Sequence, residues 1–297
     1  MADIGSVVGT GEESSGRGVN GTGQFVGSST FVNSAGFLHA FIYSDGAAID
    51  LGTFGGTSSS ANAINASGVV AGEARDATGL DLAFLYSNGI MTNLGSLGGS
   101  SSALAINDSG QVTGGSQLGL TDYVEHAFLC TAGSPMKDLG TLGGSVSRGT
   151  GINASGQVVG FSSVSGVIYH PFLYSNGVMH DLGTFGTGDT GDAIAINDFG
   201  QVVGSSNFRP GSSTTAAFLY SNGVMVDLNT KIPTGTGWTL QEGYGINNSG
   251  QIIGTGIFHG QTEHAFLLTP IPAPEPSTLA LSAFGFLALA WRLRRRA

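Results

Sequence analysis

The sequence repeats itself about every 44 residues. The segment His-Ala-Phe-Leu-Tyr-Ser-Asn-Gly, or a close variant of it, occurs six times, with its phenylalanine at Phe41, Phe84, Phe128, Phe172, Phe218 and Phe266. Between successive copies lie an Asp-Leu-Gly, an Ala-x-x-Ile-Asn and a Gly-Gln-Val-Val-Gly segment, each with variations. A period of this length is typical of a fold built from one small unit, in which each unit buries its apolar face against its neighbours.

The turns between these segments predict antiparallel hairpins. Asn-Gly and Asp-Gly dipeptides suit two-residue type I′ turns, because both central residues of such a turn have positive φ. They occur between the third and fourth segments, at Asp45-Gly46, Asn88-Gly89, Asn176-Gly177 and Asn222-Gly223. An Asn-x-Ser-Gly turn joins the first and second segments, beginning at Asn65, Asn107, Asn153 and Asn247. Each repeat is therefore expected to be a four-stranded antiparallel meander.

The strand segments, such as Ala-Phe-Leu-Tyr and Gln-Val-Val-Gly, are nearly continuous apolar runs, which indicates burial on both faces. Sheets stacked on one another provide that burial, and a four-stranded unit of about 40–45 residues is typical of a propeller blade. A parallel β-helix is the main alternative, but it has no hairpin turns within each coil. We predict an all-β fold over residues 1–269, a β-propeller of about six four-stranded antiparallel blades.

The two ends of the repeat array complement each other. The chain starts in a fourth segment, Asp3 to Gly5, and the last repeat ends in its third, His264 to Leu268. The N-terminal strand is therefore expected to complete the last blade and close the ring, which removes the exposed edges of an open stack. The chain opens without the basic start and apolar core of a secretion signal, so we expect the natural start to lie upstream.

The repeat resembles that of the HAF-repeat family of bacterial extracellular proteins, whose members often carry the kind of C-terminal tail described next. The resemblance covers nearly everything before Pro270. It departs from the family pattern where Leu82 and Ala216 replace the histidine, and where Pro171 replaces the alanine.

The C-terminal tail has three parts. Residues 270–277 form a proline-rich stalk with the tripeptide Pro274, Glu275 and Pro276, and such a segment is extended and accessible. Residues 278–291 are uncharged and long enough for about 21 Å of a roughly 30 Å hydrocarbon core, which favours a temporary transmembrane segment over a permanent one. Residues 292–297 hold a positive cluster that is expected to stay in the cytoplasm, namely Arg292, Arg294, Arg295 and Arg296.

This order of parts resembles the PEP-CTERM sorting signal, which an exosortase-type membrane protease recognises and removes. The resemblance implies a secreted or cell-surface protein of a Gram-negative bacterium, held transiently at the inner membrane by its tail. The alternatives are an ordinary C-terminal helix packed on the domain and a permanent membrane anchor.

Charge and residue types exclude several functions. Once the four tail arginines are removed, six basic residues oppose 20 acidic ones, which argues against nucleic acid and anionic lipid as partners. Four histidines, His39, His126, His170 and His264, occupy one position of the repeat, so they lie around a ring and each is expected to bond within its own blade. Asp189 and Asp192 supply too few ligands for calcium. The sequence shows no nucleophile elbow or phosphate loop, and we predict no catalytic residue, metal or cofactor.

The longer connections, from second to third strand and from blade to blade, should emerge on one side of the ring, where binding residues are expected. The longest of them, Lys231 to Glu242, holds Trp238, which would contact a sugar or a protein, or fill a gap between blades. The candidate binding residues on this face are Trp238, Glu242, Glu73, Arg75, Asp76, Tyr123, Asp189, Asp192 and Arg209.

Taken with both resemblances, these features predict a non-enzymatic surface propeller that binds or builds the exopolysaccharide matrix or envelope. Its partners would be the exosortase and matrix polysaccharide or proteins. One alternative is a propeller hydrolase or lyase acting on polysaccharide, which would need a close carboxylate pair or a bound cation. Another is a surface propeller that its tail anchors permanently.

Overall fold

The computed structural model describes residues 14–31, 34–121, 124–187, 189–209 and 214–271. Three predicted features lie outside these residues: the closing strand at Asp3 to Gly5, the candidate binding residue Tyr123, and the sorting tail from residue 272 onward. No helix of the described residues has the length and apolar character needed to cross a membrane.

The described strands form six antiparallel sheets, one for each repeat. The first contains β1 (Ser14–Val19), β2 (Phe25–Thr30), β3 (Leu38–Ser44) and β4 (Ala47–Asp50). The second contains β5 (Gly55–Ile64), β6 (Val70–Asp76), β7 (Asp81–Ser87) and β8 (Ile90–Asn93). The third contains β9 (Ser101–Ile106), β10 (Gln111–Gln117), β11 (Glu125–Thr131) and β12 (Lys137–Asp138).

The fourth sheet contains β13 (Ser147–Ile152), β14 (Val158–Ser165), β15 (Ile168–Ser175) and β16 (Val178–Asp181). The fifth contains β17 (Gly191–Ile196), β18 (Val202–Asn207), β19 (Thr215–Ser221) and β20 (Val224–Asp227). A 3-10 turn, η2 (Leu228–Thr230), leads to the sixth, with β21 (Trp238–Ile246), β22 (Ile252–Phe258) and β23 (Glu263–Leu268). The predicted four-stranded meander is thus confirmed for five repeats, and the sixth has three strands among the described residues.

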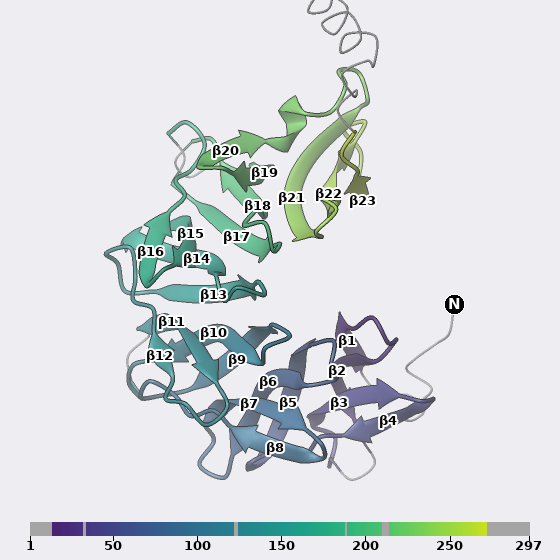
Figure 1. Cartoon of the computed structure of the whole chain (residues 1–297), viewed down its shortest axis with the longest axis vertical. Coiled ribbons are helices and arrows are strands. Elements are labelled where there is room, and N and C mark those ends of the chain that lie inside the picture. Colours follow the sequence, from purple (N-terminus) through teal and green to yellow (C-terminus); the bar gives the residue numbers. More distant parts are fainter. Residues whose placement is uncertain (1–13, 32–33, 122–123, 188, 210–213, 272–297) are drawn as a thin grey trace, which may run out of the picture.

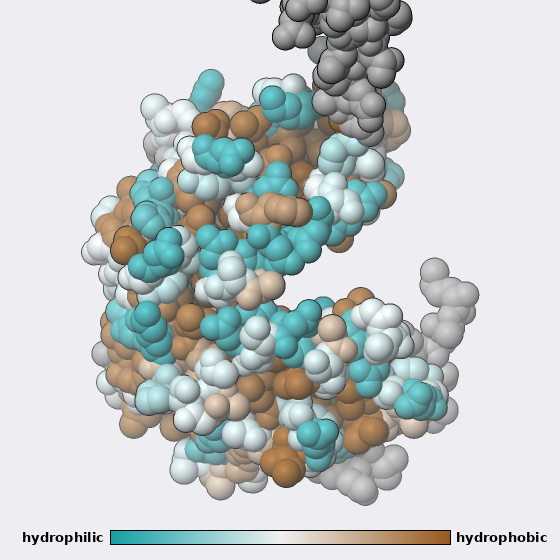
Figure 2. Space-filling model, viewed as in Figure 1, coloured by the Kyte–Doolittle hydropathy of each residue, from teal (hydrophilic) through white to brown (hydrophobic). Residues whose placement is uncertain are grey.

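The sheets follow one another around an arc, as in a propeller (Figure 1). The first strand of each sheet is innermost, and β1, β5, β9, β13, β17 and β21 contact one another in that order. The arc is open between the first sheet and the sixth in Figures 1 and 2. The all-β class and the six antiparallel sheets agree with the prediction, whereas the described residues do not close the ring.

The hairpin turns have the predicted geometry. Asp45, Asn88, Asn176 and Asn222 have φ between 51° and 54°, and the glycine that follows each of them also has positive φ. Both central residues of a type I′ turn need such φ values, which asparagine, aspartate and glycine adopt most readily. The local dipeptide therefore decides which strands pair here.

The repeated phenylalanine forms the core. Its six copies are buried, with five of them no more than 1% exposed and Phe266 8% exposed, and the five copies from Phe84 onward pack between their own sheet and the preceding one. Each core cluster draws on two neighbouring sheets; in one of them Val203 and Ala217 of the fifth sheet pack with Leu240 and Phe266 of the sixth. Burial on both faces of a sheet explains why the strand segments are continuous apolar runs.

A ladder of asparagine side chains ties the sheets together at the turns that follow the innermost strands. We call these residues the asparagine ladder: Asn20, Asn65, Asn107, Asn153, Asn197 and Asn247. Except for the last, each donates from Nδ2 to the main-chain oxygen of the next one, at 2.9–3.2 Å. Each side-chain oxygen also accepts main-chain N–H groups of its own turn. The ladder therefore fixes each turn and joins it to the following sheet.

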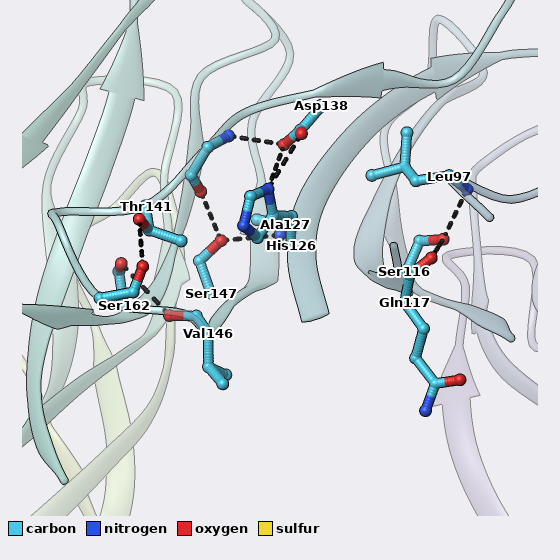
Figure 3. A network of polar contacts seen from close by, with 12 residues as sticks. Leu97, Ser116, Gln117, His126, Ala127, Asp138, Thr141, Val146, Ser147 and Ser162 are labelled. Carbon is cyan, nitrogen blue, oxygen red and sulfur yellow. Dashed lines mark hydrogen bonds and ion pairs between the residues drawn. The ribbon is translucent and has the colours of Figure 1, made fainter. Parts of the chain in front are cut away.

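A second repeated contact joins the sheets through a serine, which we call the serine clip (Figure 3). Ser147 Oγ accepts from the main-chain N–H of Ala127 at 2.8 Å and donates to the oxygen of Gly140 at 2.5 Å. Ser59 and Ser101 make the same two bonds at their interfaces. At the fourth interface Pro171 has no N–H to donate, and Gly191 replaces the serine.

The histidine of the repeat bonds within its own sheet, as predicted. Nδ1 of His39, His126 and His170 lies 2.8–2.9 Å from the nearer carboxylate oxygen of the aspartate that ends the fourth strand, namely Asp50, Asp138 and Asp181. His126 and Asp138 face each other in Figure 3. These pairs hold the outer strand of the sheet in register.

Candidate functional site: a charged groove lined by serines

Two adjoining hollows lie over the first four sheets, and we call them together the serine groove. Their volumes are about 210 and 160 Å³, and Glu73 and Asp81 line both. Six of the serines that line the hollows lie on or directly before the innermost strands β5 and β9, namely Ser58, Ser59, Ser60, Ser100, Ser101 and Ser102. The hydroxyl groups of Ser59 and Ser101 already form the serine clip, so the other four are those that a ligand could use. Figure 2 shows polar surface along the inner side of the arc. The groove is therefore a polar surface rich in hydroxyl groups.

Two ion pairs frame the serine groove. Arg75 donates from Nε and Nη2 to both carboxylate oxygens of Asp81, at 2.9 and 2.8 Å. Arg148, on the innermost strand of the fourth sheet, bonds Glu125 of the third sheet in the same two-pronged way at 2.5 and 2.7 Å. Hydrogen bonds to these carboxylates are the largest cause that raises the pKa of each guanidinium. The pairs therefore fix the side chains in place.

Glu73 differs from the other charged residues of the groove. It lies in β6 opposite Ser60 and Ala83, and its charge helps to raise the pKa of both Arg75 and Arg148. Within the described parts of the chain, no hydrogen bond or ion pair involves its carboxylate. An ionised carboxylate accepts hydrogen bonds at two oxygens, so Glu73 can accept from ligand hydroxyl groups.

A second charged group lies on the innermost strands of the last two sheets. Asp192 of β17 is half-buried, and desolvation raises the pKa of its carboxyl, with a further contribution from the charge of Glu242 in β21. The Tyr244 hydroxyl donates to Glu242 Oε2, and this bond raises the pKa of Tyr244. Two interacting carboxyl groups are a pattern that acid–base chemistry can use.

Replacing Asp192 with asparagine is expected to stabilise the protein at pH 7. Because the pKa of Asp192 is raised on folding, its ionised form costs free energy in the folded state above that pKa, and this cost disappears below the ordinary value of 3.8. The gain in the free energy of unfolding should therefore shrink as the pH falls toward 3.8. Urea unfolding of both proteins from pH 3.5 to pH 8 measures it.

Asp198→Asn is the matched control for this prediction. Hydrogen bonds from the Ala154 N–H and the Asn248 amide lower the pKa of Asp198. Its substitution should therefore lose stability at pH 7, and the loss should fade as the pH falls through the lowered pKa. A change of the same sign for both variants would show that the carboxyl at Asp192 has no raised pKa.

The structure places the other predicted binding residues apart from the groove. Asp76 accepts hydrogen bonds from Thr78 and Leu80 and so closes its own hairpin. Asp189 accepts from the Asn207 amide at 2.7 Å, and Arg209 is exposed in the connection after β18.

Trp238 lies on a strand and not in the predicted loop. The loop from Lys231 ends at Gly237, because Trp238 to Ile246 pair with β22, so Glu242 is also a strand residue. The Trp238 ring is 5.0 Å from the ring of Phe258 and packs against the core of the sixth sheet. This packing matches the alternative in which Trp238 fills a gap.

Sequence reasoning missed Arg17, Asp81, Glu125 and Arg148 as residues of the groove. A compositional signal could have indicated part of this set. Only six basic residues precede the tail, and Arg17, Arg75 and Arg148 all line the groove. Within the described residues, no group of three or more His, Cys, Asp or Glu side chains is placed to hold a metal ion.

The repeated sheets, arranged around an arc with their first strands innermost, define a β-propeller-like protein. At residues 272–296 the chain matches the family model described as the PEP-CTERM protein-sorting motif. This motif implies a secreted or cell-surface protein that an exosortase, a membrane protease, processes. None of the curated proteins with which the chain was compared matches its sequence.

Solved structures similar to the chain share its fold at low sequence identity. The β-propeller domain of the Trilobed protease from Pyrococcus furiosus, described as having an open velcro topology, aligns with a TM-score of 0.58 and 10% identity over 86% of this chain and 82% of that chain. The acylaminoacyl peptidase of Pyrococcus horikoshii aligns with a TM-score of 0.53 and 13% identity over 89% of this chain. The alignment spans 46% of the peptidase, and at this identity it shows a similarity of fold alone.

Proposed function

We propose that the protein is a non-enzymatic HAF-repeat propeller that exosortase-type sorting delivers to the cell surface of a Gram-negative bacterium, where it binds the exopolysaccharide matrix. The observation that carries this proposal is the sorting motif at residues 272–296. In this account the segment 278–291 holds the chain in the inner membrane until the protease cuts near Pro274 to Pro276. The arginines of residues 292–297 keep the end of the tail in the cytoplasm.

Variants of the tripeptide test the delivery step. Replacing Pro274, Glu275 and Pro276 together with alanine is expected to leave the protein uncut and associated with the membrane fraction. Pro272→Ala is the matched control, because it removes a stalk proline outside the tripeptide and should be processed like the parent. Release of the triple variant into the medium at the rate of the parent would overturn the delivery step.

The serine groove supports the binding role. It offers the carboxylate of Glu73, which has no hydrogen bond or ion pair among the described residues, together with paired guanidinium groups and serines, and such groups hydrogen-bond to the hydroxyl groups of a sugar chain. The acidic balance of the chain before the tail disfavours polyanionic ligands. We therefore assign a neutral, hydroxyl-rich polysaccharide as the ligand class.

Glu73→Ala tests this assignment. A hydrogen bond to a charged group is worth about 1.5–3 kcal/mol, so loss of one such bond should weaken binding roughly tenfold or more. Affinity electrophoresis in gels that contain exopolysaccharide from the producing bacterium measures the change. Glu263→Gln, an exposed change on β23, is the control and should migrate like the parent. Equal retardation of all three proteins would rule out the groove as the binding site.

A polysaccharide hydrolase or lyase is the second candidate, favoured by the interaction between Asp192 and Glu242. An enzyme of this kind needs two carboxyl groups that flank the scissile bond. It predicts release of reducing ends from the same exopolysaccharide, abolished in both Asp192→Asn and Glu242→Gln. Absence of such release by the parent protein supports the binding role.

A further inference from the structure

A pocket of about 430 Å³ lies between the fifth and sixth sheets, and we call it the Phe199 pocket. The turns that join β17 to β18, β19 to β20 and β21 to β22 form it. The serine groove lies at the opposite ends of the strands, beside the turn between β6 and β7 that Arg75 and Asp81 flank. The Phe199 pocket is therefore a separate site, and small-molecule sites usually have volumes of about 300–1,000 Å³.

Phe199 is an exception to the repeat. It is 74% exposed, and it occupies the third position of the tight turn that follows the innermost strand. The other five repeats have a small hydroxyl residue there, namely Thr22, Ser67, Ser109, Ser155 and Ser249. The Phe199 N–H donates to Oδ1 of Asn197 at 3.1 Å, so the asparagine ladder fixes the turn that carries the ring. A ligand that binds a ring on a fixed main chain has less chain entropy to overcome.

The space of the pocket is one that a glutamine fills at other interfaces. There the glutamine at the start of a second strand lies against the turn glycine of the next sheet. A Cβ at that glycine would be 2.8–3.6 Å from the glutamine Oε1, in the pairs Gly68 with Gln24, Gly156 with Gln111 and Gly200 with Gln157. At Gly250 a Cβ would meet only Pro270 within 4 Å among the described residues. Gln201 therefore leaves this space open.

The polar groups that line the pocket have hydrogen-bonding capacity to spare. Gln201 accepts from the Asn197 amide at Oε1, at 2.7 Å, while its own Nε2 makes no hydrogen bond to the described residues. The Ser221 hydroxyl and the Asn222 amide likewise have no partner in the described parts of the chain. Amides and hydroxyls both donate and accept, so these groups can pair with hydroxyl groups of a ligand.

Charge is absent from the lining of the pocket, as far as the described residues form it. The neighbouring carboxylate of Asp198 accepts from the Ala154 N–H and from the Asn248 amide, at 2.9 and 2.7 Å. A charged ligand would lose hydration in the pocket without an opposite charge to compensate for it. The lining therefore favours an uncharged ligand.

We propose that the Phe199 pocket binds one unit of a neutral sugar chain. The C–H face of the sugar ring stacks on Phe199, and its hydroxyl groups bond to Gln201, Ser221 and Asn222. A sugar ring has an apolar face and a hydroxyl edge, which match an exposed aromatic ring beside amide and hydroxyl groups. This site is additional to the serine groove, and only the source of the probe used below rests on the proposed function.

Phe199→Ser tests the proposal, because it restores the hydroxyl residue of the other repeats and should leave the fold intact. The probe is the neutral oligosaccharide fraction from partial hydrolysis of the exopolysaccharide of the producing bacterium. All proteins are full chains in mild detergent that carry Glu73→Ala, which removes the carboxylate of the serine groove. In an NMR titration Phe199→Ser should lower the affinity roughly tenfold, as loss of a central aromatic contact does. Phe199→Trp keeps an aromatic ring and should bind at least as tightly.

A spectroscopic signature separates stacking from a structural role of the residue. The ring current of a stacked aromatic shields the protons above it, so C–H signals of the bound sugar should move upfield, and Phe199→Ser should abolish this shift. Asn222→Gly removes only an amide, since glycine suits the φ of 51° at this position. It should lower the affinity several-fold and keep the upfield shift.

Ile90→Ser is the matched control, because Ile90 is an apolar residue of β8, 67% exposed and outside the pocket. It should bind like its Glu73→Ala parent. Unchanged affinity in Phe199→Ser, or an equal loss in Phe199→Ser and Ile90→Ser, would overturn the proposal.

Glu73→Ala by itself separates this proposal from the proposed function. If Glu73→Ala abolishes all binding of the probe, the groove stands and the Phe199 pocket is refuted. If Glu73→Ala binds like the natural chain and the added Phe199→Ser removes binding, the pocket stands and the groove is refuted. A natural chain that binds no probe would contradict both.

Discussion

Gly160→Ala is expected to destabilise the protein by more than about 3 kcal/mol, enough to prevent folding at 37 °C in a marginally stable chain. A Cβ atom at this position would lie 1.9 Å from the main-chain oxygen of Arg148 and 3.0 Å from the Phe172 ring. Neither neighbour can give way, because β13 is held in its ladder with β14 and Phe172 is fully buried. Urea unfolding followed by circular dichroism measures the loss.

The same close approach occurs in every repeat. The glycine that ends each Gln-Val-Val-Gly segment would place a Cβ 1.8–2.1 Å from a main-chain oxygen of the innermost strand, at Gly27, Gly72, Gly114, Gly160, Gly204 and Gly254. The innermost strand shifts its register beside this glycine in each sheet, which lets the two main chains approach. The absence of a side chain is therefore a requirement of the repeat.

Gly16→Ala is the control for this prediction. Gly16 also lies in a strand, but a Cβ there would meet no atom within 4 Å. It should change the free energy of unfolding by less than about 0.5 kcal/mol. A Gly160→Ala variant as stable as Gly16→Ala would contradict the close packing of β13 and β14.

Asn153→Ala is expected to cost about 3–4 kcal/mol of unfolding free energy. Asn153 is 3% exposed, and its amide donates to Gln157 Oε1 at 2.8 Å and to the oxygen of Asn197 at 3.1 Å. Its side-chain oxygen accepts from the Gln157 N–H and the Ser155 hydroxyl. Alanine would leave several buried polar groups without partners, at about 1–3 kcal/mol for each fully buried group. Chemical unfolding measures this cost.

Ser155→Ala is the control that distinguishes the stability contributed by the bond between sheets from that contributed by the turn. Ser155 belongs to the same turn, and among the described residues its hydroxyl bonds Asn153 and Gln157, both of its own sheet. Its loss should cost about 0.5–1 kcal/mol. If both variants lost equal stability, the bond between sheets would contribute nothing measurable.

Local signals predicted the parts of the fold that short segments determine. Asn88 and Gly89 adopt the positive φ that their turn requires, so these two residues determine the hairpin. The spacing of Phe41, Phe84 and the later copies indicated the number of sheets. Contacts between repeats were not predictable in this way. The bond from Asn153 to Asn197 and the ion pair of Glu125 with Arg148 join residues 44 and 23 positions apart.

The residues of the candidate site likewise divide into those that a local segment predicts and those that only contacts between sheets bring together. Glu73 and Arg75 could be predicted as binding residues because they lie near the end of a second strand, where long connections begin. Arg148 enters the groove only because the fourth sheet packs beside the third, which the sequence does not encode in any one segment. The length of the connection from Lys231 to Glu242 predicts a loop at Trp238, whereas in the structure β21 begins at Trp238 and pairs with β22 in an irregular register.

The intact mass of the protein recovered outside the cell tests the central claim most directly. Expressed in a host with its exosortase, the protein should lose the residues that follow the region of Pro274 to Pro276, and it should appear in the medium or at the cell surface. In the same host without the protease it should keep its full mass and stay in the membrane fraction. Full-length protein in both hosts would contradict sorting and indicate a permanently anchored propeller.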